Sequence, residues 1–200
     1  MGRGTFHLQT IVRTLLAPAL LAVCVSPLAI SLNAGQTAAL DLNGAPLDPF
    51  NASRGKVVVL IFVRTDCPIS NRYSPAIQRL SAAHAANTAF WLVYPDQAES
   101  PGAIRKHEHD FGYQLPALRD VQRTLVKQSH VHITPEAAVF DAHHRLIYHG
   151  RIDNLYEDIG RSRSAATTHE LDDAIQAALT GKTLLADSAP AVGCYISDLE

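Results

Sequence analysis

The sequence predicts an α/β protein in which a mixed central sheet is sandwiched between helices. The chain has 200 residues, which is enough for one domain with a full hydrophobic core. Hydrophobic residues make up 47% and charged residues 18%, an ordinary globular balance that argues against disorder. After the first 34 residues, apolar runs typical of strands alternate with stretches of helical spacing, which favours helices on both sides of a sheet.

The strongest strand signal is the apolar run 57–63, which is unbroken and is therefore expected at the centre of the sheet, covered on both faces. Residues 89–93 predict a second buried strand. A turn at 141–144 separates two strand signals and predicts a returning pair. In order, we expect strands or extended pieces over 40–42, 57–63, 89–93, 115–118, 137–140 and 146–149.

Four stretches predict helices: 70–84, 101–111, 121–128 and 170–179. The third is expected to turn Val121, Leu125 and Val126 inward. The last has an apolar stripe that includes Leu171 and Ile175, and Gly181 is expected to end it. The segment 161–164 is expected to be an exposed loop.

The first 34 residues have the pattern of a secretory signal peptide. Arg3 and Arg13 give a basic start without any acid, and an apolar run over 15–30 follows. The organisation that we predict is a signal peptide over 1–34, a domain over 38–182 and a C-terminal tail over 183–200 that carries Cys194. The mature protein is then secreted or periplasmic and has no stable membrane span. A lipid anchor on Cys24 or an uncleaved anchor is the less favoured alternative.

Composition excludes several other classes. The formal net charge of -2 shows no basic excess, which argues against an electrostatic nucleic-acid binder. Three cysteines are too few for a disulfide scaffold or a structural zinc site. His130 and His132 would share a face of an extended segment, but spacing places no third ligand beside them. We expect neither a metal nor a cofactor.

The residues that carry chemistry follow the strongest strand. Cys67 stands between that strand and the next helix, where unpaired backbone N–H groups and the helix dipole favour a thiolate. Arg64 and Arg72 add positive charge nearby, and Asp66 opposes them. The pattern predicts a reactive cysteine, and the alternative is a buried cysteine packed as a small hydrophobe.

These positions resemble the thioredoxin-fold redoxins, a group that includes thioredoxins, periplasmic thiol oxidoreductases and peroxiredoxins. Cys67-Pro68-Ile69-Ser70 stands where that family carries Cys-x-x-Cys, and Pro75 matches its helix proline. Thr134-Pro135 matches the cis-proline loop that faces the active cysteine. The resemblance covers about residues 38–180. Within the family, the sequence most resembles a bacterial, secreted subgroup of thioredoxin-like or peroxiredoxin-like proteins. It implies a thioredoxin-like three-layer sandwich in which Pro68, Ser70, Thr134 and Pro135 contact substrate.

The chain also departs from the family pattern. Ser70 replaces the second cysteine, and Ile61 stands where thioredoxins have a buried acid. Peroxiredoxins place Thr three residues before the cysteine; here Thr65 is displaced by one. Arg151 is the candidate for the family's thiolate-stabilising arginine. Cys67 is left to act alone, to pair with Cys194, or to be oxidised by a peroxide and then resolved.

We therefore predict an extracytoplasmic thiol oxidoreductase with Cys67 as nucleophile on a disulfide or hydroperoxide and Cys194 as candidate resolving cysteine. Its partners would be a disulfide-bearing protein or a small thiol or peroxide, together with an external thiol reductant. The alternative from another class is a non-catalytic binding module in which a Cys67–Cys194 disulfide is a permanent staple. A third hypothesis is a metal-binding module that uses Cys67 and His132.

Overall fold

The computed structural model describes residues 1–2, 39–182 and 190–196. The chain separates into two units, Met1–Ala34 and Gly35–Glu200, and only the second is considered below. The predicted signal peptide and Cys24 lie outside the described residues, apart from the first two positions. Within the part of the chain that is described, no helix has the length and apolar character needed to cross a membrane.

The core of the protein is a five-stranded mixed sheet. The central strand β1 (Val57–Phe62) pairs in parallel with β2 (Thr88–Tyr94) and antiparallel with β5 (Glu136–Phe140). The outer strands are β3 (Ala117–Arg119) and β6 (Leu146–Gly150), and the order is β3-β2-β1-β5-β6. Every residue of β1 is buried, so the strand predicted to be central lies at the centre.

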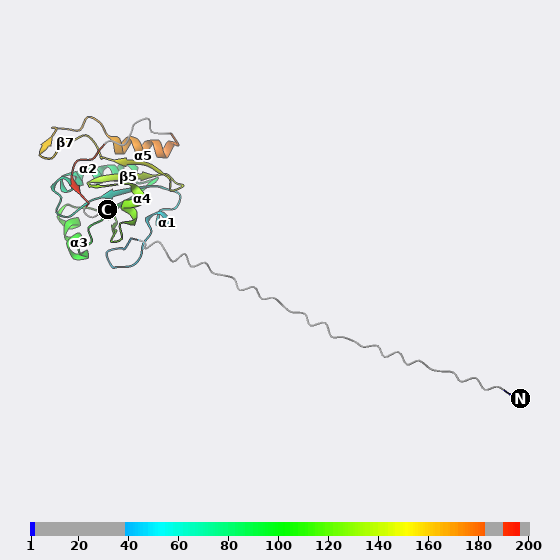
Figure 1. Cartoon of the computed structure of the whole chain (residues 1–200). Helices are drawn as coiled ribbons and strands as arrows, with labels where there is room; N and C mark the ends of the chain where they lie inside the picture. Colours follow the sequence, from blue (N-terminus) through cyan, green and yellow to red (C-terminus); the bar gives the residue numbers. More distant parts are fainter. Residues whose placement is uncertain (3–38, 183–189, 197–200) are drawn as a thin grey trace. The chain divides into compact units, whose positions relative to one another are not determined.

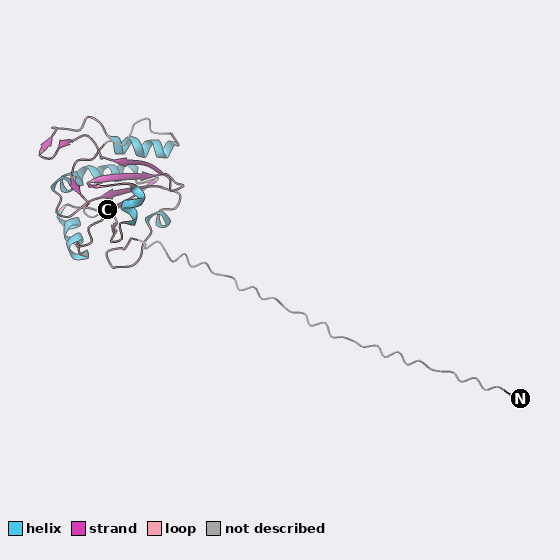
Figure 2. Ribbon diagram, in the orientation of Figure 1, coloured by secondary structure: helices cyan, strands magenta, loops and turns pink. Residues whose placement is uncertain are grey.

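Helices cover both faces of this sheet, as Figures 1 and 2 show. On one face, α2 (Pro68–His84) and α5 (Glu170–Thr180) pack against alternate residues of β1, with Ile77 and Ile175 in contact with the cluster around Ile61. On the other, α1 (Pro49–Ala52) and α4 (Thr124–Ser129) pack around Leu60 and Phe62. The remaining helix, α3 (Pro101–Asp110), adds Ile104 to the first cluster. The predicted three-layer α/β sandwich is confirmed.

Three local predictions were wrong. The helix expected over 121–128 begins at Thr124, because the Asp120 carboxylate accepts from the amides of Thr124 and Val126 and holds 121–123 in a turn. The strand expected over 40–42 is reduced to single bridges of Leu40. The segment expected to be a loop at 161–164 contains β8 (Arg161–Ser162), which pairs with β7 (Tyr156–Asp158).

A further short pair of strands builds the site. Directly before Pro135, β4 (Ile133–Thr134) pairs antiparallel with β9 (Cys194–Tyr195) from the C-terminal segment. The C-terminal cysteine is thereby attached to the loop that precedes β5. In Figure 1 the red β9 lies against the body of the domain.

Candidate active site

Cys67 lies at the start of a helix and inside the protein. It is the N-cap residue of α2, Pro68 fills the first helical position, and the Asn71 amide donates to the Cys67 carbonyl at 3.0 Å. Proline suits that position because its nitrogen has no hydrogen to satisfy. The side chain is fully buried, with 0% of its surface exposed. The sulfur therefore lies at the positive end of the helix dipole, shielded from bulk water.

The structure brings Cys194 to the same place. Thr134 is the register partner of Cys194, and its hydroxyl donates to the Cys194 carbonyl at 3.3 Å. The Cys67 thiol donates to the Thr134 carbonyl at 3.1 Å, and the Thr134–Pro135 peptide bond is cis. Both cysteines are free thiols, with Cys67 buried and Cys194 partly exposed. Four of the residues singled out in the sequence thus form one cluster.

The two thiols have opposite tendencies to ionise. Burial opposes ionisation of Cys67, but the Cys194 thiol and the Ser70 hydroxyl and amide donate toward its sulfur and lower its pKa below the ordinary value. Burial raises the pKa of Cys194 to about 11, with the neighbouring Cys67 sulfur as the next cause. The surroundings of the pair therefore favour the anion on Cys67 and the protonated thiol on Cys194.

Ser70 cannot form a disulfide, but its hydroxyl helps to lower the pKa of Cys67. Its side chain is fully buried, and the hydroxyl has no ordinary hydrogen-bond partner within the part of the chain described. A buried hydroxyl without a partner is costly, unless an anion forms beside it. Cys67 is the neighbour that can supply such an anion, and Ser70 helps to lower its pKa.

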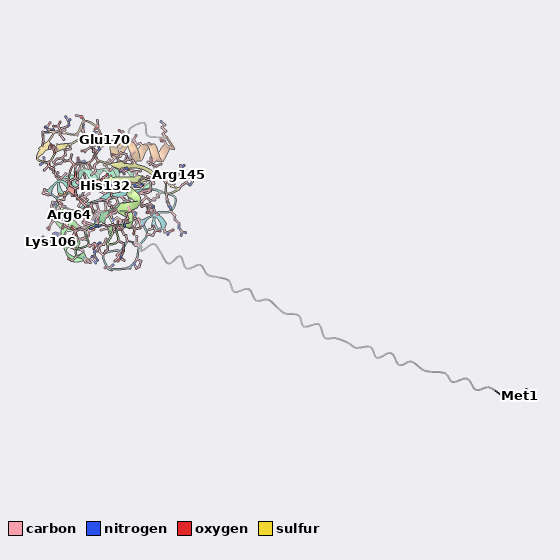
Figure 3. The ribbon with its side chains drawn as sticks, viewed as in Figure 1. Met1, Arg64, Lys106, His132, Arg145 and Glu170 are labelled. Carbon is pink, nitrogen blue, oxygen red and sulfur yellow. The ribbon has the colours of Figure 1, made fainter. Side chains whose placement is uncertain are left out.

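Arg64 is an arginine whose charge acts on Cys194. It lies after β1, where Figure 3 labels it, and it lowers the pKa of Cys194 while bonding Asp66 at 3.0 Å and Asp96 at 3.3 Å. Arg151 instead forms an ion pair with Glu170 at the start of α5. The candidate arginine of the sequence is thus directed to a helix terminus, where it holds the pKa of Glu170 low despite the burial of that carboxyl.

Thr65 contributes its backbone. Its amide donates to the Glu99 carboxylate at 2.6 Å. Glu99 is buried, its second oxygen has no partner within the described ranges, and burial raises its pKa. A buried acid on the loop after β2 thus holds the backbone of Thr65, two residues before Cys67.

A second set of hydrogen bonds holds the other side of Thr65. The side-chain Nδ2 of Asn71 donates to the Thr65 carbonyl at 3.3 Å, and Asn71 Oδ1 lies 2.8 Å from His107 Nε2. His107 Nδ1 lies 2.9 Å from the Tyr94 hydroxyl, and burial lowers the pKa of His107. A neutral ring that donates from Nε2 and accepts at Nδ1 satisfies every member of this chain. Sequence reasoning missed Glu99 and His107, because neither lies near Cys67 in the sequence.

The other histidines are not gathered into a metal centre. His130 and His149 have ring centroids 6.1 Å apart, and His149 lies 3.4 Å from the Glu136 carboxylate. The exposed His132 contributes its backbone to the pairing with the C-terminal segment. Among residues 39–182 and 190–196, no group of three or more metal-ligating side chains is found.

The fold and the paired thiols define a thioredoxin-fold redoxin. Residues 33–149 match the AhpC/TSA family, and since this is more than half of the chain, the protein belongs to that family. A search of curated proteins finds no match. Family membership supports an oxidoreductase.

Several solved structures share the fold. A hypothetical protein of Sinorhizobium meliloti 1021 has a TM-score of 0.67 at 22% identity, over 80% of this chain and 91% of its own. An uncharacterized conserved protein of Geobacillus kaustophilus has a TM-score of 0.67 at 21% identity, over 81% and 89%. A secreted Mycobacterium tuberculosis disulfide oxidoreductase, described as homologous to E. coli DsbE, has a TM-score of 0.52 at 22% identity, over 71% and 96%. At these identities the likeness shows the fold alone.

Proposed function

We propose that the protein is an extracytoplasmic thiol oxidoreductase in which Cys67 is the nucleophile and Cys194 resolves the covalent intermediate. The observation that carries this proposal is the proximity of the two cysteines. Thr134 lies opposite the partly exposed Cys194, and its carbonyl accepts from the Cys67 thiol at 3.1 Å. This proximity of cysteines far apart in the sequence supports the assignment of Cys194 as the group that attacks the sulfur of Cys67.

On a disulfide substrate, the Cys67 thiolate attacks one sulfur, a mixed disulfide forms, and the other sulfur leaves as a thiolate. The Cys194 thiolate then attacks the Cys67 sulfur and displaces the substrate's remaining thiolate, which takes up a proton. On a hydroperoxide, Cys67 attacks the terminal oxygen and releases an alcohol or water, and Cys194 displaces water from the resulting sulfenic acid. Either route ends in a Cys67–Cys194 disulfide that an external thiol must reduce.

Cys67, Ser70 and the Thr134–Pro135 loop are the residues that we assign to the reaction, with Pro68 setting the helix start. Thr65 acts through its backbone, which Glu99 and Asn71 hold on both sides. We assign Arg64 rather than Arg151 to charge stabilisation, because Arg64 lowers the pKa of Cys194, whereas Arg151 is paired with Glu170.

A thiol count tests the proposal. The mature protein is equilibrated in graded redox buffers, alkylated and analysed by mass spectrometry. A Cys67–Cys194 disulfide that opens at mild potential supports the cycle. One that resists below roughly -300 mV indicates a structural staple and favours a binding module. Two free thiols under all conditions would remove Cys194 from the mechanism. Fractionation of native cells, with N-terminal sequencing, tests the proposed export and the cleavage near residue 34.

A further inference from the structure

The strand that carries Cys194 fills the edge of β4, directly beside the Thr134–Pro135 bond. It lies there as an extended segment, with Thr134 opposite Cys194 and Ile133 opposite Tyr195. The Ile196 amide extends the pairing by donating to the His132 carbonyl at 2.9 Å. These contacts engage backbone atoms, so the pairing itself does not depend on the side chains of Cys194, Tyr195 and Ile196.

Side chains of this segment face two directions in turn. Cys194 faces Cys67, Tyr195 is 73% exposed, and Ile196 is 5% exposed within the cluster around α4. This alternation has the period of two that is typical of a strand. Cys194 and Ile196 therefore lie on the side that faces the protein, where Cys194 meets Cys67 and Ile196 is an apolar anchor. The exposed Tyr195 makes no hydrogen bond through its side chain within the described residues.

The backbone of Gly193 lies so close to Thr134 that only glycine fits at the position before Cys194. A Cβ atom at this position would lie 2.0 Å from the Thr134 carbonyl oxygen and 2.7 Å from its carbon. The obstacle is backbone beside the Cys67 sulfur, so it cannot swing aside as a flexible side chain would. Any segment seated as this one is must therefore have glycine directly before its cysteine.

We propose that Gly193–Ile196 is the resident ligand of a polypeptide groove along β4, and that substrates of this site are extended protein segments in which glycine precedes the cysteine. This inference rests on the proposed function, since it names the substrate class and the gate of the same site. With the segment seated, Cys67 has no exposed surface, so a protein disulfide reaches its sulfur only when the segment leaves. A substrate then pairs with β4 as the segment did.

The first measurement uses the Cys194→Ser variant of the full chain, which keeps the segment but cannot resolve a mixed disulfide. The probes are two synthetic peptides with the sequence of residues 190–197, one with the native glycine and one with alanine in its place, each activated at its cysteine with 2-thiopyridine. The Cys67 thiolate attacks the cysteine sulfur, a Cys67–peptide disulfide forms, and 2-thiopyridine leaves with the electron pair and takes a proton. Its release is followed by absorbance.

We expect the glycine peptide to react at least tenfold faster than the alanine peptide, whereas glutathione in solution attacks both peptides equally. Equal rates at Cys67 would overturn the groove, and the proposed function would stand. If Cys67 reacts with neither peptide nor with 2,2′-dithiodipyridine, the proposed function itself fails.

The second measurement tests the gate. We expect Gly193→Ala combined with Cys194→Ser to react with the glycine peptide at least tenfold faster than Cys194→Ser alone, because the resident segment can no longer seat. Gly102→Ala combined with Cys194→Ser is the matched control, since a Cβ there would meet only Ser100 Oγ at 3.9 Å. Equal rates in all three variants, with thermal unfolding showing a folded domain, would overturn the gate.

Discussion

Truncation of Ile196 should expose Cys67 without unfolding the domain. Ile196 anchors the C-terminal strand: its side chain is buried, and its amide donates to His132 at 2.9 Å. Shortening a buried isoleucine to alanine costs about 2–5 kcal/mol. The strand β9 is held by a two-residue pairing, so the cost should fall on its seating rather than on the sheet. Even about 2 kcal/mol increases the open population roughly 30-fold.

Alkylation of Cys67 by iodoacetamide, followed by mass spectrometry of the reduced protein, measures this opening. We expect a rate increase of at least about 30-fold for Ile196→Ala. Tyr195→Ala is the control, because Tyr195 lies on the same strand with 73% of its surface exposed. The reasoning is refuted if Ile196→Ala leaves the alkylation rate of Cys67 at the wild-type value, or if Tyr195→Ala raises it as much.

Three further outcomes follow from single side chains. Ser70→Ala should raise the pKa of Cys67, since one donor to the thiolate is lost, and the pH dependence of alkylation should move upward accordingly. Glu99→Gln should become more stable relative to wild type as pH rises above the ordinary carboxyl range, which thermal unfolding against pH would show. Burial raises the pKa of Glu99, so its stabilising contribution is present at low pH and is lost as the carboxyl ionises. Asp141→Asn should destabilise the protein by about 1–2 kcal/mol at neutral pH. Burial opposes ionisation of Asp141, but hydrogen bonds from Arg145 outweigh it and lower the pKa, so in denaturant titrations this difference should disappear as pH falls through the lowered pKa.

The sheet and its covering helices could be predicted because the pattern of apolar and helix-ending residues within each segment is enough to indicate them. The run that became β1 is apolar at every position, and Gly181 ends α5 as expected, in the left-handed conformation. The start of α4 could not be read in the same way. Val121 and Leu125 have helical spacing, but the Asp120 carboxylate captures the amides of the first turn and moves the start to Thr124.

In the candidate site, too, some residues could be predicted from their neighbours in the sequence and others could not. The place of Cys67 could be predicted from its neighbours in the sequence. A cysteine between a strong strand and a helix lies at the helix N-terminus, beside unpaired backbone N–H groups. The expectation for Arg151 came from a family pattern, and the ion pair with Glu170 shows what its guanidinium does here. Glu99 had no sequence signal, because this buried acid on a neighbouring loop meets the Thr65 amide only after the sheet has formed.

The environments of the two sulfurs suggest how one pair can carry out both halves of the reaction. While Cys67 is a thiolate, it accepts from Cys194 and helps to keep the resolving thiol protonated. Once Cys67 has formed a bond to substrate, that negative charge is gone, and the contribution of Cys67 to the raised pKa of Cys194 disappears with it. When the C-terminal strand has replaced the substrate on β4, the charge of Arg64 favours the Cys194 thiolate. Cys194 thus becomes easier to ionise at the stage when its attack is required, which orders the two steps without any movement of an acid or base.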